Sequence, residues 1–202
     1  MKKLTTTNSA KKIALIILLV AAVAFPQVIS NSYIVHVVII ALIYSILASS
    51  LNLMSGYTGL LSLGQQAFYG IGAYASALTM MKLNFPFILS FLIAGLFAML
   101  SAWFIGRLTI RLRSSFFVIS TVAFAKILEL VCINWVGLTQ GPMGLTAIPK
   151  PSIFGYEFSS VASQYYLILI VAILCIYVCY KIVNSHTGLV FKSVADSENV
   201  TR

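Results

Sequence analysis

The chain has 202 residues, of which 60% are hydrophobic and only 8% charged, and its mean hydropathy is +1.02. A soluble domain carries roughly 25% charged residues, so this composition excludes an ordinary soluble protein and predicts a membrane protein. The formal net charge of +9 is compatible with nucleic-acid binding, but the basic residues are distributed as in a membrane protein, as described below.

Six apolar segments predict an all-α, polytopic integral membrane protein with about six membrane segments. A membrane helix needs about 20 apolar residues, and runs near that length occur at 13–29, 33–54, 87–105, 116–135 and 165–183. A sixth run, at 66–81, is shorter and richer in glycine. We expect one transmembrane domain over residues 1–202, with cytoplasmic residues 1–12, membrane segments and loops at 13–183, and a cytoplasmic segment at 184–202.

The lysines and arginines sort to one side of the predicted membrane. If the N-terminus is cytoplasmic, six alternating spans place ten of the twelve cations outside the spans on the cytoplasmic side, all except Lys82 and Lys150. The positive-inside rule describes this asymmetry, so both termini are expected in the cytoplasm. The lysine-rich start and the Ala22-Val23-Ala24 step also imitate a signal peptide, and cleavage there would leave the later spans in the same orientation.

A glycine-rich stretch at 55–75, SGYTGLLSLGQQAFYGIGAYA, lies between apolar runs. We expect Gly56, Gly59 and Gly64 to interrupt the helical backbone. At membrane depth such a break is tolerated only where the chain is packed in protein or lines a watery cavity. Exposed carbonyls and amides would then be available to a polar solute. The sequence therefore predicts a translocation path shaped by Gly56, Gly59, Ser62, Gly64, Gln65 and Gln66.

Two stripes of small residues predict close helix packing. In lipid, small side chains let helix backbones approach each other, and this replaces the hydrophobic effect as a driving force. The stripes are Ala94, Ala98 and Ala102 in one run, and Gly72, Ala73, Ser76 and Ala77 in another. We interpret both as ordinary packing surfaces of a helix bundle.

Two charged residues, Lys126 and Glu129, fall within the run at 116–135. Unpaired, each would cost from about 2.5 kcal/mol upward at bilayer depth, so we expect them to pair. One interpretation is a gate or a polar wall of the solute path. The alternative is an intrahelical ion pair that only aids helix docking. A proton relay is less favoured because Glu129 is the only carboxylate within a predicted span.

Catalytic and metal-binding motifs are absent from the sequence. There is no GxxxxGK[ST] phosphate loop and no HExxH, CxxC or GxSxG. The cysteines, Cys132, Cys175 and Cys179, all lie in apolar runs and indicate neither a disulfide framework nor a metal site. We therefore expect a protein that is not an enzyme, has no ATPase site of its own and needs no cofactor or metal.

The connection at 137–164, which the predicted topology places on the outer side of the membrane and which we call the outer loop, is the only long one outside the predicted membrane segments. Its four glycines and three prolines favour tight turns over a regular helix. Aromatic residues flank it, where amphipathic rings favour the headgroup layer: Trp135, Tyr156, Tyr165 and Tyr166.

Three motifs, in this order, resemble the permease subunits of branched-chain amino acid ABC importers of the LivM type: GYTGLLSLGQQAFYGIGAYA, RLRSSFFVISTVAFAKILELV and LTQGPMGLTAIP. The third is the most specific, because LTxGPxGL followed by IP is hard to reach by hydrophobic composition alone. The resemblance covers about residues 44–198. In the outer loop it singles out Thr139, Gly141, Pro142 and Gly144.

The resemblance implies a set of partners. A related permease would pair with this chain to form a path, two cytoplasmic ATPase subunits would drive it, and a periplasmic or lipid-anchored binding protein would deliver leucine, isoleucine or valine. No nucleic acid is expected. The tail is similar to the family's loop that couples permease to ATPase, with Gly188, Lys192, Asp196 and Glu198 at the matching positions. ATP-driven closure would then move helices as rigid bodies.

Two departures from the family pattern stand out. Family members commonly carry an acidic and then a basic residue where this chain has Lys126 and then Glu129, and they continue through further spans beyond Arg202. We therefore expect a chain that is incomplete relative to the family, truncated at its C-terminus. Three alternatives remain open: the same machinery for urea, amides or other amino acids; a self-contained channel or secondary carrier; and an inactive remnant.

Overall fold

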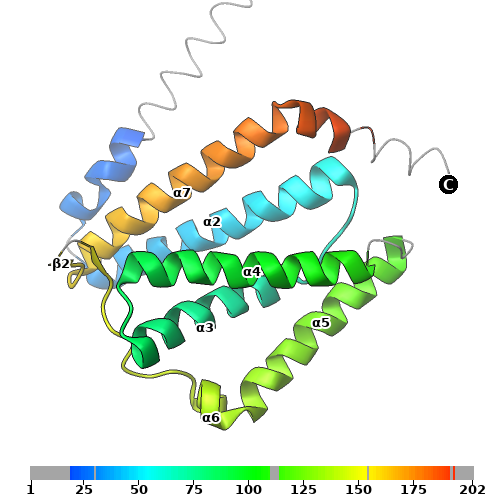
Figure 1. Cartoon of the computed structure of the whole chain (residues 1–202). Helices are drawn as coiled ribbons and strands as arrows, with labels where there is room; N and C mark the ends of the chain where they lie inside the picture. The colour runs from blue at the N-terminus through cyan, green and yellow to red at the C-terminus, as the bar shows by residue number, and fades with distance from the viewer. Residues whose placement is uncertain (1–18, 30, 110–113, 154, 192, 194–202) are drawn as a thin grey trace, which may run out of the picture.

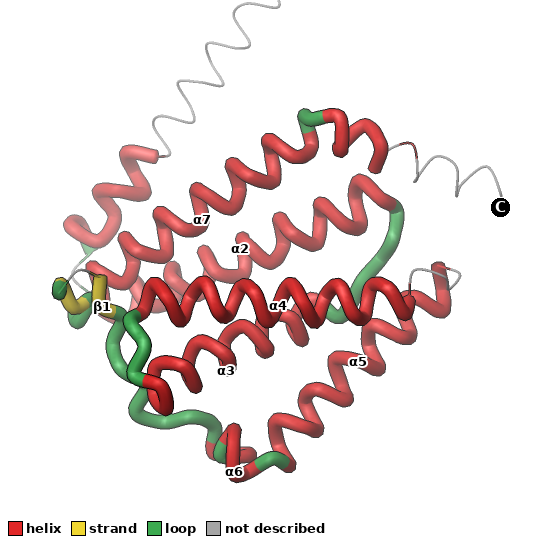
Figure 2. The backbone as a smooth tube through the Cα atoms, in the orientation of Figure 1, coloured by secondary structure: helices red, strands yellow, loops and turns green. Residues whose placement is uncertain are grey.

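The computed structural model of the chain describes residues 19–29, 31–109, 114–153, 155–191 and 193. Within these residues it is a bundle of long helices with one small hairpin (Figures 1 and 2). The elements are α2 (Ser32–Thr58), α3 (Gln65–Leu83), α4 (Phe87–Thr109), α5 (Ser114–Asn134), α6 (Val136–Thr139), the 3₁₀ helix η1 (Gly141–Met143), β1 (Ser152–Ile153), β2 (Tyr156–Glu157) and α7 (Val161–Val183).

Four of the described helices are long and apolar enough to cross a membrane: α2, α4, residues Phe116–Asn134 of α5, and α7. The prediction of a polytopic, all-helical membrane protein is thus confirmed. α3 has 19 residues, but its two glutamines, two glycines and one serine leave it less apolar than these four. The first predicted span is described only over the apolar helix Leu19–Val28.

Local capping explains where two of the spans begin. The Asn31 side chain accepts a hydrogen bond from the Tyr33 N–H at 3.0 Å and so starts α2. In the same way the Ser160 hydroxyl accepts from the Ser163 N–H at 3.1 Å, so α7 begins at Val161. The predicted connection at 137–164 therefore ends at Ser160, because this N-cap starts the helix four residues earlier than the apolar run at 165–183 indicates.

Helices α2 and α7 lie side by side (Figure 1) and share a core of Val35, Ile39, Tyr165 and Leu169. The helix Leu19–Val28 covers Tyr165, which is only 2% exposed. The Tyr165 hydroxyl donates to the Ala22 carbonyl oxygen at 2.7 Å. Tyr165 therefore packs in the protein interior, and its depth relative to the headgroup layer stays a prediction.

Helices α3 and α4 form a second pair, joined by the predicted stripes of small residues. A Cβ atom on Gly72 would lie 3.7 Å from the Ala94 carbonyl oxygen and 3.9 Å from the Ala98 Cβ. Ala77 and Ala94 are buried. The prediction of close packing between small residues is confirmed for this part of the two stripes.

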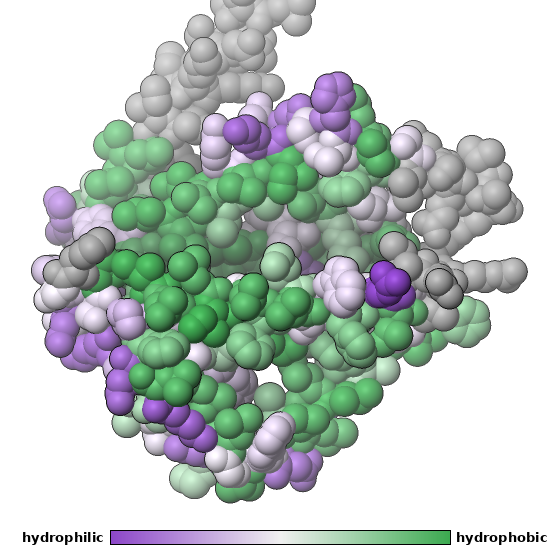
Figure 3. All heavy atoms as spheres, viewed as in Figure 1, coloured by the Kyte–Doolittle hydropathy of each residue, from purple (hydrophilic) through white to green (hydrophobic). Residues whose placement is uncertain are grey.

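The outer surface is mostly apolar. Figure 3 shows hydrophobic side chains across the face that α4 occupies, with hydrophilic residues gathered toward the margins. Large side chains such as Leu92 and Trp103 on α4 are more than half exposed. Such a surface is what a helix bundle presents when lipid replaces water as its solvent.

Candidate functional site

The backbone is broken between α2 and α3. Gly59, with φ of 75°, ends α2 in the left-handed conformation, and Gly64 precedes the first turn of α3. Gly56 lies inside α2, so the prediction that it interrupts the helix is wrong. A glycine within a helix costs only about 1 kcal/mol relative to alanine, which the surrounding apolar helix tolerates.

The broken segment is held against α5 and α2. The Leu63 N–H donates to the Thr121 hydroxyl at 3.2 Å, and the Gln65 amide donates to the Ser50 hydroxyl. A Cβ on Gly64 would lie 3.1 Å from the Thr121 carbonyl oxygen, so a glycine permits this close approach. The segment is therefore packed in protein, one of the two conditions under which a broken helix survives in a membrane.

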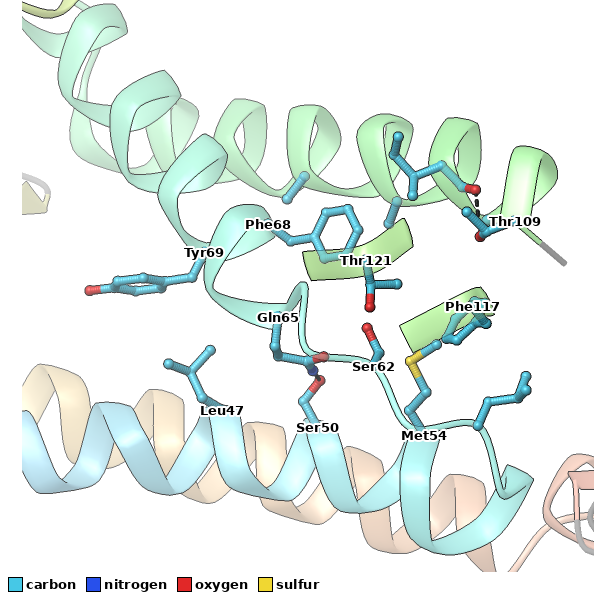
Figure 4. A pocket seen from close by; sticks show the side chains of 15 residues that line it. Leu47, Ser50, Met54, Ser62, Gln65, Phe68, Tyr69, Thr109, Phe117 and Thr121 are labelled. Atoms are coloured by element: carbon cyan, nitrogen blue, oxygen red, sulfur yellow. Dashed lines mark hydrogen bonds between the residues drawn. The ribbon is translucent and has the colours of Figure 1, made fainter. Parts of the chain in front are cut away.

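One cavity, of about 540 Å³, lies beside this segment among α2, α3, α4 and α5. Figure 4 shows Ser62 and Thr121 facing one another, with Gln65 next to Ser50. Most of the other lining side chains are apolar. Two of the predicted path residues, Ser62 and Gln65, thus line this cavity.

A second cavity, of about 750 Å³, lies between α3 and α5, and we call it the α3–α5 groove. It brings together three groups that the sequence analysis predicted separately: Gln66 from α3, the charged pair from α5, and the outer loop. Gly56, Gly59 and Gly64 line neither cavity. The residues that line the groove include Leu63, Gln66, Tyr74, Val122, Lys126, Leu128, Glu129, Cys132, Ile133, Gly141, Pro142, Met143 and Gly144.

The two charged side chains in the groove form an ion pair. The Lys126 Nζ donates to the Glu129 Oε2 at 2.8 Å, and the side chains are 70% and 54% exposed. Both residues lie within the membrane-spanning part of α5. Ionisable side chains at such depth typically face a bundle interior or a water-filled cavity, and the groove provides this setting.

The outer loop folds back onto the end of α5. Thr139 is buried, and its hydroxyl donates to the Cys132 carbonyl oxygen at 2.6 Å while accepting from the Gly141 N–H at 3.2 Å. Gly141 has φ of +61°, and a Cβ there would lie 2.9 Å from the Ile133 carbonyl oxygen. Thr139 and Gly141 therefore position the loop, whereas Pro142 and Gly144 line the groove beside Gly141.

Of the predicted coupling residues, Gly188 is described, whereas Lys192, Asp196 and Glu198 lie outside the described residues. Residues 186–191 are helical, and the Gly188 N–H donates to the Ser185 carbonyl oxygen at 3.0 Å. A Cβ on Gly188 would overlap the Val183 carbonyl and lie 2.9 Å from the Ile182 carbonyl oxygen. Gly188 thus lets this helix contact the end of α7 backbone to backbone.

Sequence reasoning missed several residues that line the two cavities. Ser50 and Thr121 bind the broken segment, and Tyr74 and Cys132 line the groove. The polar Ser49, Ser50 and Asn52 within an otherwise apolar run were a signal that could have been followed. Tyr74 and Cys132 gave no such signal, because only the packing of α3 beside α5 brings them together.

Fold and site define a multi-pass helical membrane protein with a groove that holds an ion pair of a membrane-spanning helix. Residues 33–202 match the family model described as branched-chain amino acid transport system / permease component, and the chain belongs to this family. Family and spans together place it in the bacterial inner membrane.

Two relatives have the same name, high-affinity branched-chain amino acid transport system permease protein LivM. The protein of Escherichia coli K12 is 39% identical over 154 residues, which are 76% of this chain and 36% of the relative. The protein of Salmonella typhimurium LT2 is 38% identical over 149 residues, which are 74% of this chain and 35% of the relative. The chain thus spans about a third of the length of these curated relatives. No solved structure matches it.

Proposed function

We propose that the chain is a membrane permease subunit of an ABC importer that carries leucine, isoleucine and valine across the inner membrane. The observation that carries the proposal is the α3–α5 groove, in which Gln66, the Lys126–Glu129 pair and the outer loop line one cavity. A passage through a bilayer needs polar groups at membrane depth, and the groove holds the one ion pair found among the described residues. Membership of the permease family supports the assignment.

The proposed machinery includes partners that supply what this chain lacks. The sequence has no phosphate loop, so two cytoplasmic ATPase subunits would provide the energy, and the chain would perform no chemistry on its cargo. A related permease would form the other wall of the path, and a periplasmic or lipid-anchored binding protein would deliver the amino acid. Both termini would lie in the cytoplasm, as the distribution of lysine and arginine favours.

The predicted site residues then take separate roles. Ser62, Gln65 and Gln66 would line the path on either side of the first turn of α3. Gly59 and Gly64 would give the backbone break its shape, and the ion pair would tune the gate. Gly188 would hold the helical tail against the end of α7, so that a push from an ATPase reaches the membrane helices as a rigid-body motion.

The experiment is uptake of radioactive leucine in cells that lack their own importer and express this chain with candidate permease, ATPase and binding-protein partners. We expect ATP-dependent uptake that valine and isoleucine suppress and urea does not. If urea or amides suppressed the uptake and valine and isoleucine did not, the importer would be assigned to urea or amides instead of branched-chain amino acids. Flux in liposomes without ATPases would indicate a self-contained carrier, and failure to co-purify with any ATPase would indicate a remnant.

The coupling role is tested in the same cells by Gly188→Ala, with Gly95→Ala as the matched control. Both glycines lie in helical segments, but a Cβ on Gly95 would meet no atom within 4 Å. We expect Gly188→Ala to reduce both ATPase pull-down and uptake at least tenfold, and Gly95→Ala to change neither. Unchanged pull-down of Gly188→Ala would refute the assignment of the tail.

A further inference from the structure

The α3–α5 groove presents a positive and a negative charge side by side against an apolar wall. The Lys126 Nζ and the Glu129 Oε2 are 2.8 Å apart, and more than half of each side chain is exposed. Apolar side chains from α5, η1 and the broken segment before α3 line the same groove: Leu63, Val122, Leu128, Ile133 and Met143. A cation, an anion and an aliphatic surface within one cavity form the complement of a small zwitterion with an aliphatic side chain.

We propose that Lys126 and Glu129 together bind the head group of an aliphatic α-amino acid. The Lys126 ammonium contacts the carboxylate of the solute and the Glu129 carboxylate contacts its ammonium, so the two dipoles lie antiparallel. This inference rests on the proposed function and deepens it, because it assigns the residues that recognise the cargo inside the membrane.

The exchange of partners keeps every charge compensated. Before the solute arrives, Lys126 and Glu129 neutralise each other; while it is bound, each contacts the opposite charge of the solute; after it leaves, the intrahelical pair forms again. An unpaired charge within a membrane span is unfavourable, so a site that passes between two paired states avoids that penalty. A singly charged analogue lacks this property, because it leaves one protein charge without a new partner.

The size of the groove suits this ligand, and its affinity should be low. About 750 Å³ falls within the range of small-molecule sites. Because the solute must displace an existing ion pair, we expect a dissociation constant on the order of 1 mM. Weak binding is suited to a passage, in which a solute must enter and also leave.

Cys132 provides a reporter that is native to the chain. It lines the groove, whereas Cys179 lines a different cavity between α2 and α7. The test uses the full chain in lipid nanodiscs, with Cys175→Ser and Cys179→Ser, and measures alkylation of Cys132 by N-ethylmaleimide. A matched protein with Cys132→Ser and Cys175→Ser reports Cys179.

Leucine at 10 mM should slow alkylation of Cys132 about tenfold, by mass action at the expected affinity, and leave Cys179 unaffected. Leucinamide, which lacks the carboxylate, and 2-hydroxy-4-methylpentanoate, which lacks the ammonium, should slow it less than about twofold. This comparison needs no substitution at the charged pair, so it holds even if such a variant fails to fold.

Two variants test the residues themselves. Lys126→Met should reduce protection by leucine to less than about twofold, whereas Lys82→Met at the end of α3 should leave it unchanged. The exchanged protein, Lys126→Glu with Glu129→Lys, should keep the protection, because a zwitterion can turn around to meet the reversed pair.

The proposal is overturned if leucine does not protect Cys132, if leucinamide protects it equally well, or if Lys126→Met retains the protection. Uptake measured with the same proteins separates this outcome from failure of the proposed function. Leucine uptake without protection of Cys132 would leave the import function standing and remove the zwitterion site. Protection without uptake would keep the site and contradict the import function.

Discussion

Tyr165→Phe is expected to weaken the attachment of the helix Leu19–Val28, because the hydroxyl compensates for a proline. Pro26 has no N–H, so the carbonyl of Ala22, four residues earlier, has no helical partner. The Tyr165 hydroxyl donates to that oxygen at 2.7 Å. Its removal orphans a carbonyl in a site where Tyr165 is only 2% exposed. We expect a loss of about 1–3 kcal/mol in unfolding free energy.

The assay is a double-mutant cycle measured by SDS-induced unfolding of the full chain in micelles. Pro26→Ala restores an N–H to the helix. In that background the loss of unfolding free energy caused by Tyr165→Phe should be at least about 1 kcal/mol smaller than in the wild-type chain. Tyr166→Phe is the matched control: its hydroxyl donates at 3.0 Å to the Val23 carbonyl, whose helical partner, Gln27, retains its N–H. An equal cost of Tyr165→Phe in the wild-type chain and in the Pro26→Ala background would refute the reasoning.

Two further predictions concern helix packing and the outer loop. Gly72→Leu should destabilise the chain by about 1–3 kcal/mol, because the α3–α4 contact has no room for a long side chain, whereas Gly95→Leu, which faces open space, should be near neutral in the same SDS titration. Thr139→Val should cost about 1–3 kcal/mol by leaving the Gly141 N–H without its acceptor. Thr139→Ser keeps the hydroxyl and should cost less, and equal losses for valine and serine would argue against the hydrogen bond.

The helices could be predicted from the sequence because membrane spans are long and apolar, a signal that needs no tertiary information. The stripes of small residues likewise predicted a packing surface, and Gly72 indeed lies against Ala94 and Ala98. The boundaries depend on local capping. The N-cap Ser160 makes α7 begin at Val161, before the predicted apolar run. The left-handed Gly59 ends α2, whereas Gly56 lies within the helix.

The grouping of site residues could not be predicted, because it depends on how α3 and α5 lie relative to each other. Gln65 and Gln66 are adjacent in the chain, yet they line different cavities. From its position at the end of an apolar run, Tyr165 resembles an interfacial aromatic residue. Only its contact with the helix Leu19–Val28 shows that it is buried. Side chains that meet across more than one hundred residues leave no local signal.

The ion pair also gives a physical reason for the groove itself. Figure 1 shows α5 inclined away from α3 and α4, unlike the closely packed α3–α4 pair. Tight packing of the groove-lining face of α5 on α3 would bury Lys126 and Glu129, whose side chains are now 70% and 54% exposed. Burying an ion costs several kcal/mol, which opposes this packing. Replacing both residues with leucine should therefore close the groove, protect Cys132 from alkylation without any solute and raise stability. A double variant whose Cys132 reacts as fast as in the wild-type chain would show that the backbone, not the charges, keeps the helices apart.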